Sequence, residues 1–149
     1  MEINKNLIVV DWVKSKTVKG TILYLTLSSE QRKILRGRKV SDCNRELILQ
    51  LPREGEINDG DILRTNQENI FIHVIAKIEK LFQICTFTKF DMIKVSYHLG
   101  NRHVEMEISD NYLFIREDSV LKNLLENLGA EIKLVNKKFF PENGAFNHD

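Results

Sequence analysis

The chain has 149 residues, which is enough for one domain or for two small domains that each bury a modest core. Hydrophobic residues make up 42% of it and charged residues 29%, an ordinary balance that excludes global disorder. Its 22 basic and 21 acidic residues leave a formal net charge of +1. The chain as a whole therefore offers no electrostatic attraction for nucleic acid or for an anionic membrane.

Neither a targeting segment nor a disulfide framework is expected. The apolar run near the N-terminus is too short for the core of a signal peptide, and Asp11 interrupts it. No stretch approaches the roughly 20 apolar residues that span a bilayer. The two cysteines, Cys43 and Cys85, are far apart and form no Cys-x-x-Cys pair, which favours reduced thiols. We expect a cytoplasmic protein that binds neither membrane nor nucleic acid.

The first half of the chain has the pattern of short strands separated by turns. Strand-forming residues fill three segments, residues 21–27, 47–51 and 70–76. Pro52, Gly55 and the Asp-Gly-Asp at 59–61 are turn signals between the second and third segments. This pattern predicts a small antiparallel sandwich or barrel.

A basic segment lies between the first two of these strands. Residues 28–39 begin with two serines that could cap a helical turn, and Gly37 could end that turn. Five of the twelve residues are basic, namely Arg32, Lys33, Arg36, Arg38 and Lys39. A solvated face beside a strand is the preferred interpretation. The functional alternative is a docking patch for an acidic partner.

The second half changes to a mixed pattern. Strands are predicted at 79–87, 103–108, 112–115 and 131–135, and the alternation of polarity is clearest at 103–108. Apolar residues at helical spacing predict one helix over 91–99, with Gly100 and Asn101 as its C-cap. A second helix is predicted to begin at Asp118 or Ser119 and to end at Gly129. The order β-α-β-β-α-β is that of a ferredoxin-like domain.

These patterns together predict an α+β fold with three parts. Residues 1–75 form a small all-β domain, a barrel or sandwich that binds a peptide or partner. Residues 76–139 form a ferredoxin-like βαββαβ domain for metal binding and dimerisation, and residues 140–149 form a mobile C-terminal tail. The domain boundary is placed near residues 75–77.

The sequence has none of the dense motifs that mark common nucleotide-binding or hydrolytic enzymes. Four histidines remain as candidate ligands. His73 lies among apolar strand residues, as a structural histidine does. His98 and His103 are five residues apart, and five residues turn a helix by roughly 140°, so spacing alone does not bring them to one ion.

The heptapeptide at 97–103, Tyr-His-Leu-Gly-Asn-Arg-His, is distinctive and resembles the urease accessory nickel chaperones of the UreE family. Two other stretches agree. Residues 51–55 with 59–61 resemble the family's Leu-Pro turn followed by Gly-Asp. Residues 140–146 resemble its C-terminal Phe-x-Pro-x-x-Gly-Ala-aromatic segment, shortened by one residue before the proline. The resemblance spans nearly the whole chain.

The resemblance implies a nickel metallochaperone that delivers Ni(II) to the urease active site and is not an enzyme. In the family, the histidine that ends Gly-Asn-Arg-His comes from both protomers of a homodimer and binds nickel between them, and that histidine is His103 here. The family's histidine-rich tail has one counterpart, His148. Where some members carry histidines at the second helix, this chain has residues 117–119, Glu-Asp-Ser. The implied partners are the urease apoprotein and the urease accessory proteins, including the accessory GTPase.

The chemistry of imidazole agrees with this implied role. Nickel is the expected cargo, and zinc or copper can compete, since imidazole binds all three metals. Two alternatives stay open. One is an adaptor whose β domain holds a peptide and whose second half only dimerises. The other is a metal-dependent hydrolase that uses His98 and His103, with Glu105 or Glu107 as its base on the strand face of His103.

Overall fold

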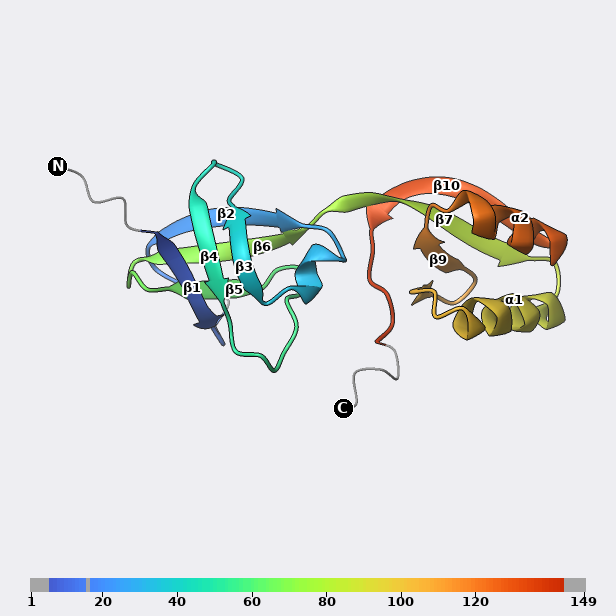
Figure 1. The fold of residues 1–149 in the computed structure, drawn as a ribbon, viewed down its shortest axis with the longest axis horizontal. Helices are drawn as coiled ribbons and strands as arrows, with labels where there is room; N and C mark the ends of the chain where they lie inside the picture. The colour runs from blue at the N-terminus through green and yellow to red at the C-terminus, as the bar shows by residue number, and fades with distance from the viewer. Residues whose placement is uncertain (1–5, 16, 144–149) are drawn as a thin grey trace. The chain divides into compact units, whose positions relative to one another are not determined.

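The computed structural model describes residues 6–15 and 17–143, and the chain divides into two compact units, Met1–Lys77 and Ile78–Asp149 (Figure 1). The first unit is a curled β-sheet with a short 3-10 helix. The second combines a four-stranded sheet with two α-helices. The predicted α+β class, an all-β domain followed by a ferredoxin-like one, is confirmed.

Six strands build the sheet of the first unit, in the spatial order β2-β6-β5-β1-β4-β3. The strands are β1 (Leu7–Trp12), β2 (Thr21–Leu27), β3 (Arg36–Val40), β4 (Glu46–Gln50), β5 (Ile62–Thr65) and β6 (Ile70–Ala76). The sheet is mixed, because β1 pairs with β4 and β2 pairs with β6 in parallel. The expected purely antiparallel arrangement was wrong, since alternation of polarity reports which face a residue occupies and not the direction of its neighbour.

The core of the first unit forms on one side of this curled sheet. Alternate residues along the strands are fully buried, as period-two patterning requires. The cluster comprises Leu7, Val9, Leu25, Leu27, Leu47, Leu49, Leu51, Ile57, Leu63, Ile72 and Val74. The loop after β4 is fastened to it by Asp61, whose carboxylate accepts hydrogen bonds from the Trp12 indole N–H at 3.1 Å and the Asn58 backbone N–H at 2.7 Å.

The basic segment folds as a turn followed by an edge strand. The Ser28 hydroxyl accepts a hydrogen bond from the Gln31 backbone N–H, and the Gln31 side chain accepts one from the Ser28 N–H. This reciprocal pair has the hydrogen bonds of a capping box and shapes the turn before the 3-10 helix η1 (Gln31–Lys33), whose N-cap is Glu30. The predicted end at Gly37 was wrong, because η1 ends at Lys33 and Gly37 belongs to β3.

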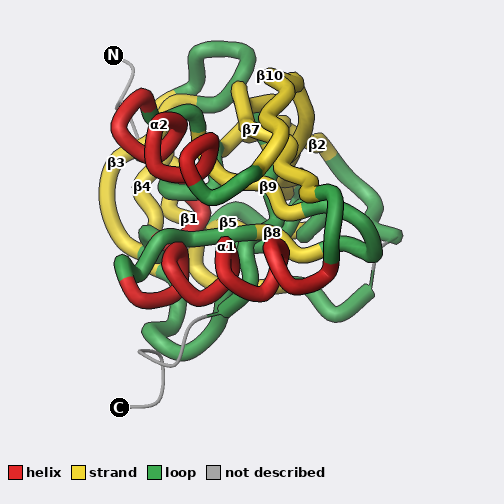
Figure 2. Tube along the Cα trace, turned by 90° about the vertical axis from the view of Figure 1, so that its right-hand side faces the viewer, coloured by secondary structure: helices red, strands yellow, loops and turns green. Residues whose placement is uncertain are grey.

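The second unit has the sheet order β10-β7-β9-β8, with all pairs antiparallel. Its elements are β7 (Ile78–Thr86), α1 (Lys89–Asn101), β8 (Glu107–Ile108), β9 (Leu113–Arg116), α2 (Ser119–Asn127) and β10 (Ala130–Lys138). In this order the last strand lies beside the first, as in a ferredoxin-like domain. Both helices, drawn in red in Figure 2, contribute to one buried cluster with β7, β9 and β10.

Local signals set both ends of α2. The Asp118 carboxylate accepts hydrogen bonds from the backbone N–H groups of Val120 and Leu121, which makes it the N-cap. Gly129 has φ +88° just after the helix, the left-handed conformation that favours glycine there. The predicted cap and stop of this helix are confirmed.

Cys43 and Cys85 are both free thiols. In the part of the chain that the structure describes, no helix is long and apolar enough to cross a membrane.

Candidate metal site at the end of helix α1

His103 occupies the position that closes helix α1. Its backbone N–H donates to the Gly100 carbonyl at 3.0 Å, and the Val104 N–H donates to the Leu99 carbonyl at 3.0 Å. With Arg102 as the C-cap, these are the two bonds of a Schellman motif, in which the residue after the cap is left-handed. His103 has φ +57°, as that motif demands.

Glycine is the usual residue at this position, because a side chain there crowds the following carbonyl. A histidine in the left-handed region costs on the order of 1–2 kcal/mol relative to an ordinary conformation. The chain places an exposed histidine at a position where glycine would cost less conformational free energy. The nearby Gly100 lies inside the helix and does not take this position. Strain of this kind directs attention to the side chain as the reason for the residue.

The predicted strand over residues 103–108 was wrong in its first four residues. Only Glu107 and Ile108 pair with β9, and residues 103–106 form a loop. The alternation of polarity is real, because Val104 and Met106 pack against the core of the unit while His103 is exposed. That inward packing produces a strand-like pattern without a neighbouring strand. The expected C-cap at Gly100 and Asn101 was also wrong, since α1 runs through both.

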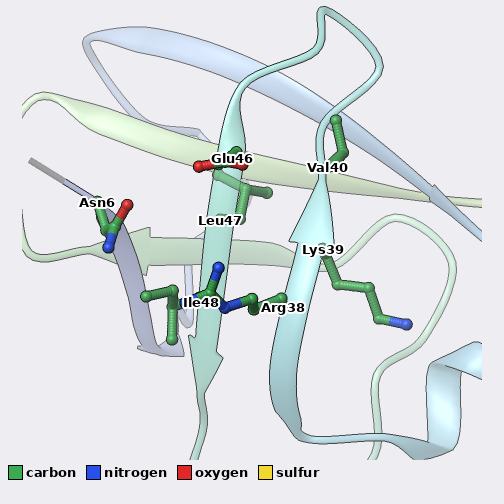
Figure 3. Close-up of a pocket in the computed structure, with 7 residues that line it drawn as sticks. All are labelled: Asn6, Arg38, Lys39, Val40, Glu46, Leu47 and Ile48. Carbon is green, nitrogen blue, oxygen red and sulfur yellow. The ribbon is translucent and has the colours of Figure 1, made fainter. Parts of the chain in front are cut away.

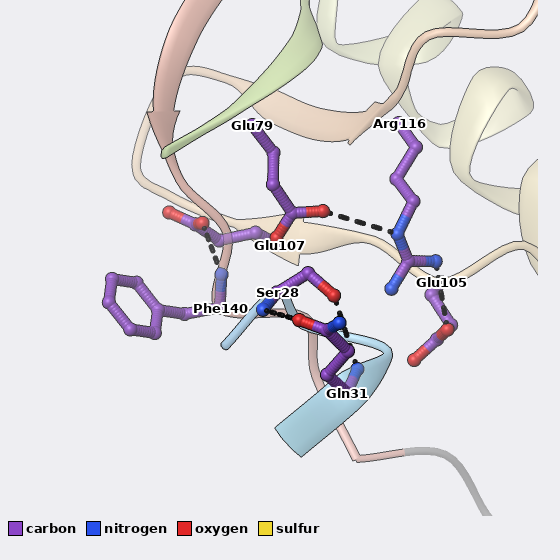
Figure 4. A network of polar contacts seen from close by, with 7 residues as sticks. All are labelled: Ser28, Gln31, Glu79, Glu105, Glu107, Arg116 and Phe140. Atoms are coloured by element: carbon purple, nitrogen blue, oxygen red, sulfur yellow. Dashed lines mark hydrogen bonds and ion pairs between the residues drawn. The ribbon is translucent and has the colours of Figure 1, made fainter. Parts of the chain in front are cut away.

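Ion pairs hold the loop that follows His103 (Figure 4). The Arg116 guanidinium lies 3.0 Å from Glu105 and 3.7 Å from Glu79. Lys137 donates to the Glu107 carboxylate at 2.6 Å. All these groups are at most 31% exposed, so the pairs are partly shielded from water. The backbone beside His103 is therefore fixed while its side chain is exposed.

The chain returns to this loop after β10. Phe139 is fully buried, with the Arg116 guanidinium 5.0 Å from its ring centre. The Phe140 N–H donates to Glu107 at 2.9 Å, and the Glu142 N–H donates to the Met106 carbonyl at 2.8 Å. The tail expected from residue 140 is thus bonded, through Glu142, to Met106, which lies three residues after His103. Its candidate ligand, His148, lies outside the described residues.

An exposed apolar stripe runs along α1 toward His103. Phe90, Ile93 and Tyr97 are spaced by three and four residues and therefore share one face of the helix. They are 68%, 67% and 66% exposed. Phe87, just before the helix, is 93% exposed. A contiguous apolar surface of this kind on a charged protein indicates a surface that contacts another molecule.

The other histidines have different surroundings. His98 is half-buried on α1, with its ring 5.4 Å from that of Tyr97. His73 lies on β6 in the first unit, with its ring 5.3 Å from that of Tyr24. Within residues 6–15 and 17–143, no three His, Cys, Asp or Glu side chains come together as a cluster that could hold a metal ion.

Glu105 and Glu107, the candidate bases of the hydrolase alternative, are not arranged as that alternative expected. Residues 103–106 are not a strand, so Glu105 and Glu107 do not share a strand face with His103. Glu105 pairs with Arg116, and Glu107 pairs with Lys137 and the Phe140 N–H. Both carboxylates hold the loop through these pairs.

Comparison with known proteins agrees across both units. Residues 9–76 match the model of the UreE urease accessory protein N-terminal domain, and residues 79–149 match that of its C-terminal domain. This chain belongs to the UreE family. A urease accessory protein UreE of Prochlorococcus marinus (strain MIT 9301) is 52% identical over 149 residues, the full length of both chains. A UreE of Synechococcus sp. (strain WH7805) is 40% identical over 83% of this chain and 71% of that protein.

The matched regions include the stretches that first indicated UreE. The heptapeptide at 97–103 spans the last turns of α1 and its Schellman motif, inside the C-terminal match. Residues 51–61 form the loop fastened to Trp12, inside the N-terminal match. Sequence reasoning selected His103 through this heptapeptide. It missed the left-handed backbone and the loop-holding pairs around it, because both depend on contacts with distant residues.

Proposed function

We propose that this UreE chain is a metallochaperone that carries Ni(II) to the urease active site during urease maturation, and that it is not an enzyme. Family membership supports the role in urease maturation. The observation that carries the nickel proposal is His103, an exposed imidazole kept on a strained backbone and surrounded by a fixed loop. We place the metal between the His103 side chains of two protomers.

Two imidazoles across a two-fold axis suit a carrier. Neutral imidazole is a good ligand for nickel, and it binds copper and zinc as well, so Cu(II) and Zn(II) compete for the site. Two protein ligands leave coordination positions open to water or to an acceptor, and nickel can leave by ligand exchange. A closed site with four protein ligands would hold its ion as a structural element.

The apolar stripe on α1 is the proposed dimer surface. Phe90, Ile93 and Tyr97 would pack on the same stripe of a second copy, since a two-fold interface uses one surface patch from both copies. The stripe lies on the helix that His103 closes, so the surface that joins the copies is continuous with the element that carries the ligand. A second copy is favoured over another partner because one His103 cannot complete a site alone.

His148 is the proposed additional ligand. A backbone hydrogen bond from Glu142 to the Met106 carbonyl holds the start of the tail beside the loop that follows His103. Residue 148 follows residue 142 by six positions, a span of at most about 22 Å at roughly 3.3–3.6 Å per residue. The anchor therefore keeps His148 within reach of the proposed site, and ligand exchange with it would regulate release.

The parts of the chain take separate tasks in this proposal. Residues 1–75 bind a peptide or partner, residues 76–139 dimerise and bind nickel, and residues 140–149 supply the tail ligand. The partners are the urease apoprotein and the accessory proteins, including the accessory GTPase, and the place of action is the cytoplasm. The competing proposal is an adaptor that dimerises without a metal role.

Nickel titration by calorimetry tests the proposal. His103→Ala removes two ligands from each dimer, so we expect its affinity to fall at least as much as the roughly 10–100-fold typical of an outer-shell change. His98→Ala is the matched control, since His98 is a half-buried residue of the same helix, and its effect should be smaller. Wild-type binding by folded His103→Ala would contradict the assignment. Absence of nickel binding by the wild type would favour the adaptor.

A further inference from the structure

The basic segment of the first unit is not used by the nickel proposal. It forms β3, an edge strand of the sheet, which pairs only with β4. Beyond the end of β3, the Asp42 backbone N–H donates a hydrogen bond to the Tyr24 carbonyl of β2. Along β3 itself, however, no second strand pairs with it within the described residues. Alternate backbone N–H and C=O groups of an edge strand point outward and can pair with another extended chain.

The side chains of this edge have a definite pattern. Arg36 and Arg38 lie on one face of the strand, with exposed Ile34 before them and exposed Val40 after them. The face therefore reads apolar, basic, basic, apolar at alternate positions. Within the described residues, Arg36 and Arg38 form no ion pair. Two cations that are not neutralised by an ion pair attract an acidic chain to this open edge.

Gly37, between the two arginines, leaves the backbone accessible. It has φ +142°, which side chains rarely adopt, and a Cβ added there would meet no atom within 4 Å. A glycine inside a strand often marks a place where another backbone approaches closely. Both the conformation and the open space are consistent with such an approach.

A pocket of about 220 Å³ lies over β3 and β4 (Figure 3). Arg38 reaches across β4 beside Ile48, while Lys39 points away from β4. Glu46 lines the same pocket opposite Val40. An acidic residue of a bound segment would therefore be favoured beside the arginines and disfavoured at the Val40 end, where an apolar residue fits.

We propose that the β3 edge binds an extended acidic segment of a partner protein by adding it as a further strand. The segment carries acidic residues opposite Arg36 and Arg38 and apolar residues opposite Ile34 and Val40. Backbone hydrogen bonds supply affinity and the alternate side chains supply specificity. A second copy of β3 is disfavoured as the occupant, because it would place arginines against arginines. This inference rests on the partner-binding role proposed for residues 1–75, and the site needs no metal.

Fluorescence anisotropy with the full-length dimer tests this proposal. The probe is a labelled seven-residue peptide with valine at both ends, two glutamates at alternate positions and threonine between them. We expect Arg38→Glu to weaken binding at least about tenfold, since it places like charges together. Lys19→Glu makes the same charge change at another exposed site and should change binding much less. Rising salt should weaken binding.

Two further peptides separate strand addition from charge alone. N-methylation of alternate residues blocks backbone donors, so one of the two methylation registers should abolish binding and the other should retain it. A peptide with lysine in place of glutamate should not bind. The proposal is overturned if the acidic peptide does not bind, if both methylated peptides bind equally well, or if Lys19→Glu matches Arg38→Glu. If the arginines of this edge only prevent aggregation, the acidic peptide will not bind. Unchanged unfolding of Arg38→Glu, followed by the fluorescence of Trp12 in the same unit, verifies its fold independently of peptide binding.

Discussion

The backbone and the side chain at residue 103 favour different amino acids. The Schellman motif needs a left-handed residue, for which glycine is best, whereas nickel binding needs the imidazole of His103. In the proposed function, position 103 therefore carries a metal ligand at a cost in stability, as functional sites commonly do.

This trade can be measured with His103→Gly. Relief of the left-handed strain gains about 1–2 kcal/mol, and the greater freedom of glycine in the unfolded chain costs about 0.5–1 kcal/mol. We expect the free energy of unfolding to rise by about 0.5–1 kcal/mol while nickel binding is lost. Urea denaturation followed by circular dichroism reports on the second unit, which holds α1 and α2.

Asn44→Gly is the matched control. Asn44 is the other non-glycine residue with a positive φ, +69°, in the part of the chain that the structure describes. It lies in the β3–β4 turn of the first unit, where Trp12 fluorescence follows unfolding. Its substitution should leave nickel binding unchanged. A clear loss of stability in His103→Gly would show that the imidazole, rather than the backbone, supports the fold.

At this scale the sequence predicted the identity of the candidate ligand but not its setting. Spacing alone did not bring His98 and His103 to one ion, and it was the heptapeptide that selected His103. The left-handed conformation was hidden because Gly100 and Asn101 looked like the stop signal. A hydrogen bond from Val104 back to Leu99 decides the end of the helix, and single-residue preferences do not reveal it.

At the scale of elements, α1 has two faces with different tasks. Val95 and Leu99 are buried in the core of the second unit, whereas Phe90, Ile93 and Tyr97 are exposed. The proposed dimer depends on the exposed face. The second unit folds around the buried face. A substitution on the exposed face can therefore disrupt the proposed dimer without unfolding the unit.

Ile93→Asp tests the role of the exposed face. It places a charge in the proposed interface, where burial without a partner is costly. We expect light scattering to report a single-chain mass instead of twice that mass, with nickel affinity reduced at least about tenfold. Ile78→Asp is the control, because Ile78 is 61% exposed, close to the 67% of Ile93, and lies outside α1. If Ile93→Asp stays dimeric, the stripe is not the interface.

The predicted elements differ in how well their sequences specified them. Residues 21–27 and 70–76 form strands with the predicted bounds, since both combine strand formers with a buried face. The strand β3 was missed because its residues are mostly charged and gain their conformation by pairing with β4. Residues 103–106 were assigned to a strand because their inward packing imitates one.

For the whole molecule, the claim is that one nickel ion joins two chains. Each chain contributes His103, and the tail contributes His148 in the proposed function. The tail complicates a count of ions, because two tails bring two more imidazoles to the dimer. A chain shortened by residues 147–149 removes them and, since the last described hydrogen bond involves Glu142, should keep its fold.

Nickel titration of this shortened chain, with its mass measured by light scattering in the same buffer, tests the central claim most directly. We expect somewhat weaker binding than in the full chain, with a stoichiometry of one nickel ion for every two chains in a dimer. His103→Ala in the same shortened chain should abolish that binding. One tightly bound ion per chain, or tight binding by a monomer, would contradict a site shared between two copies of His103.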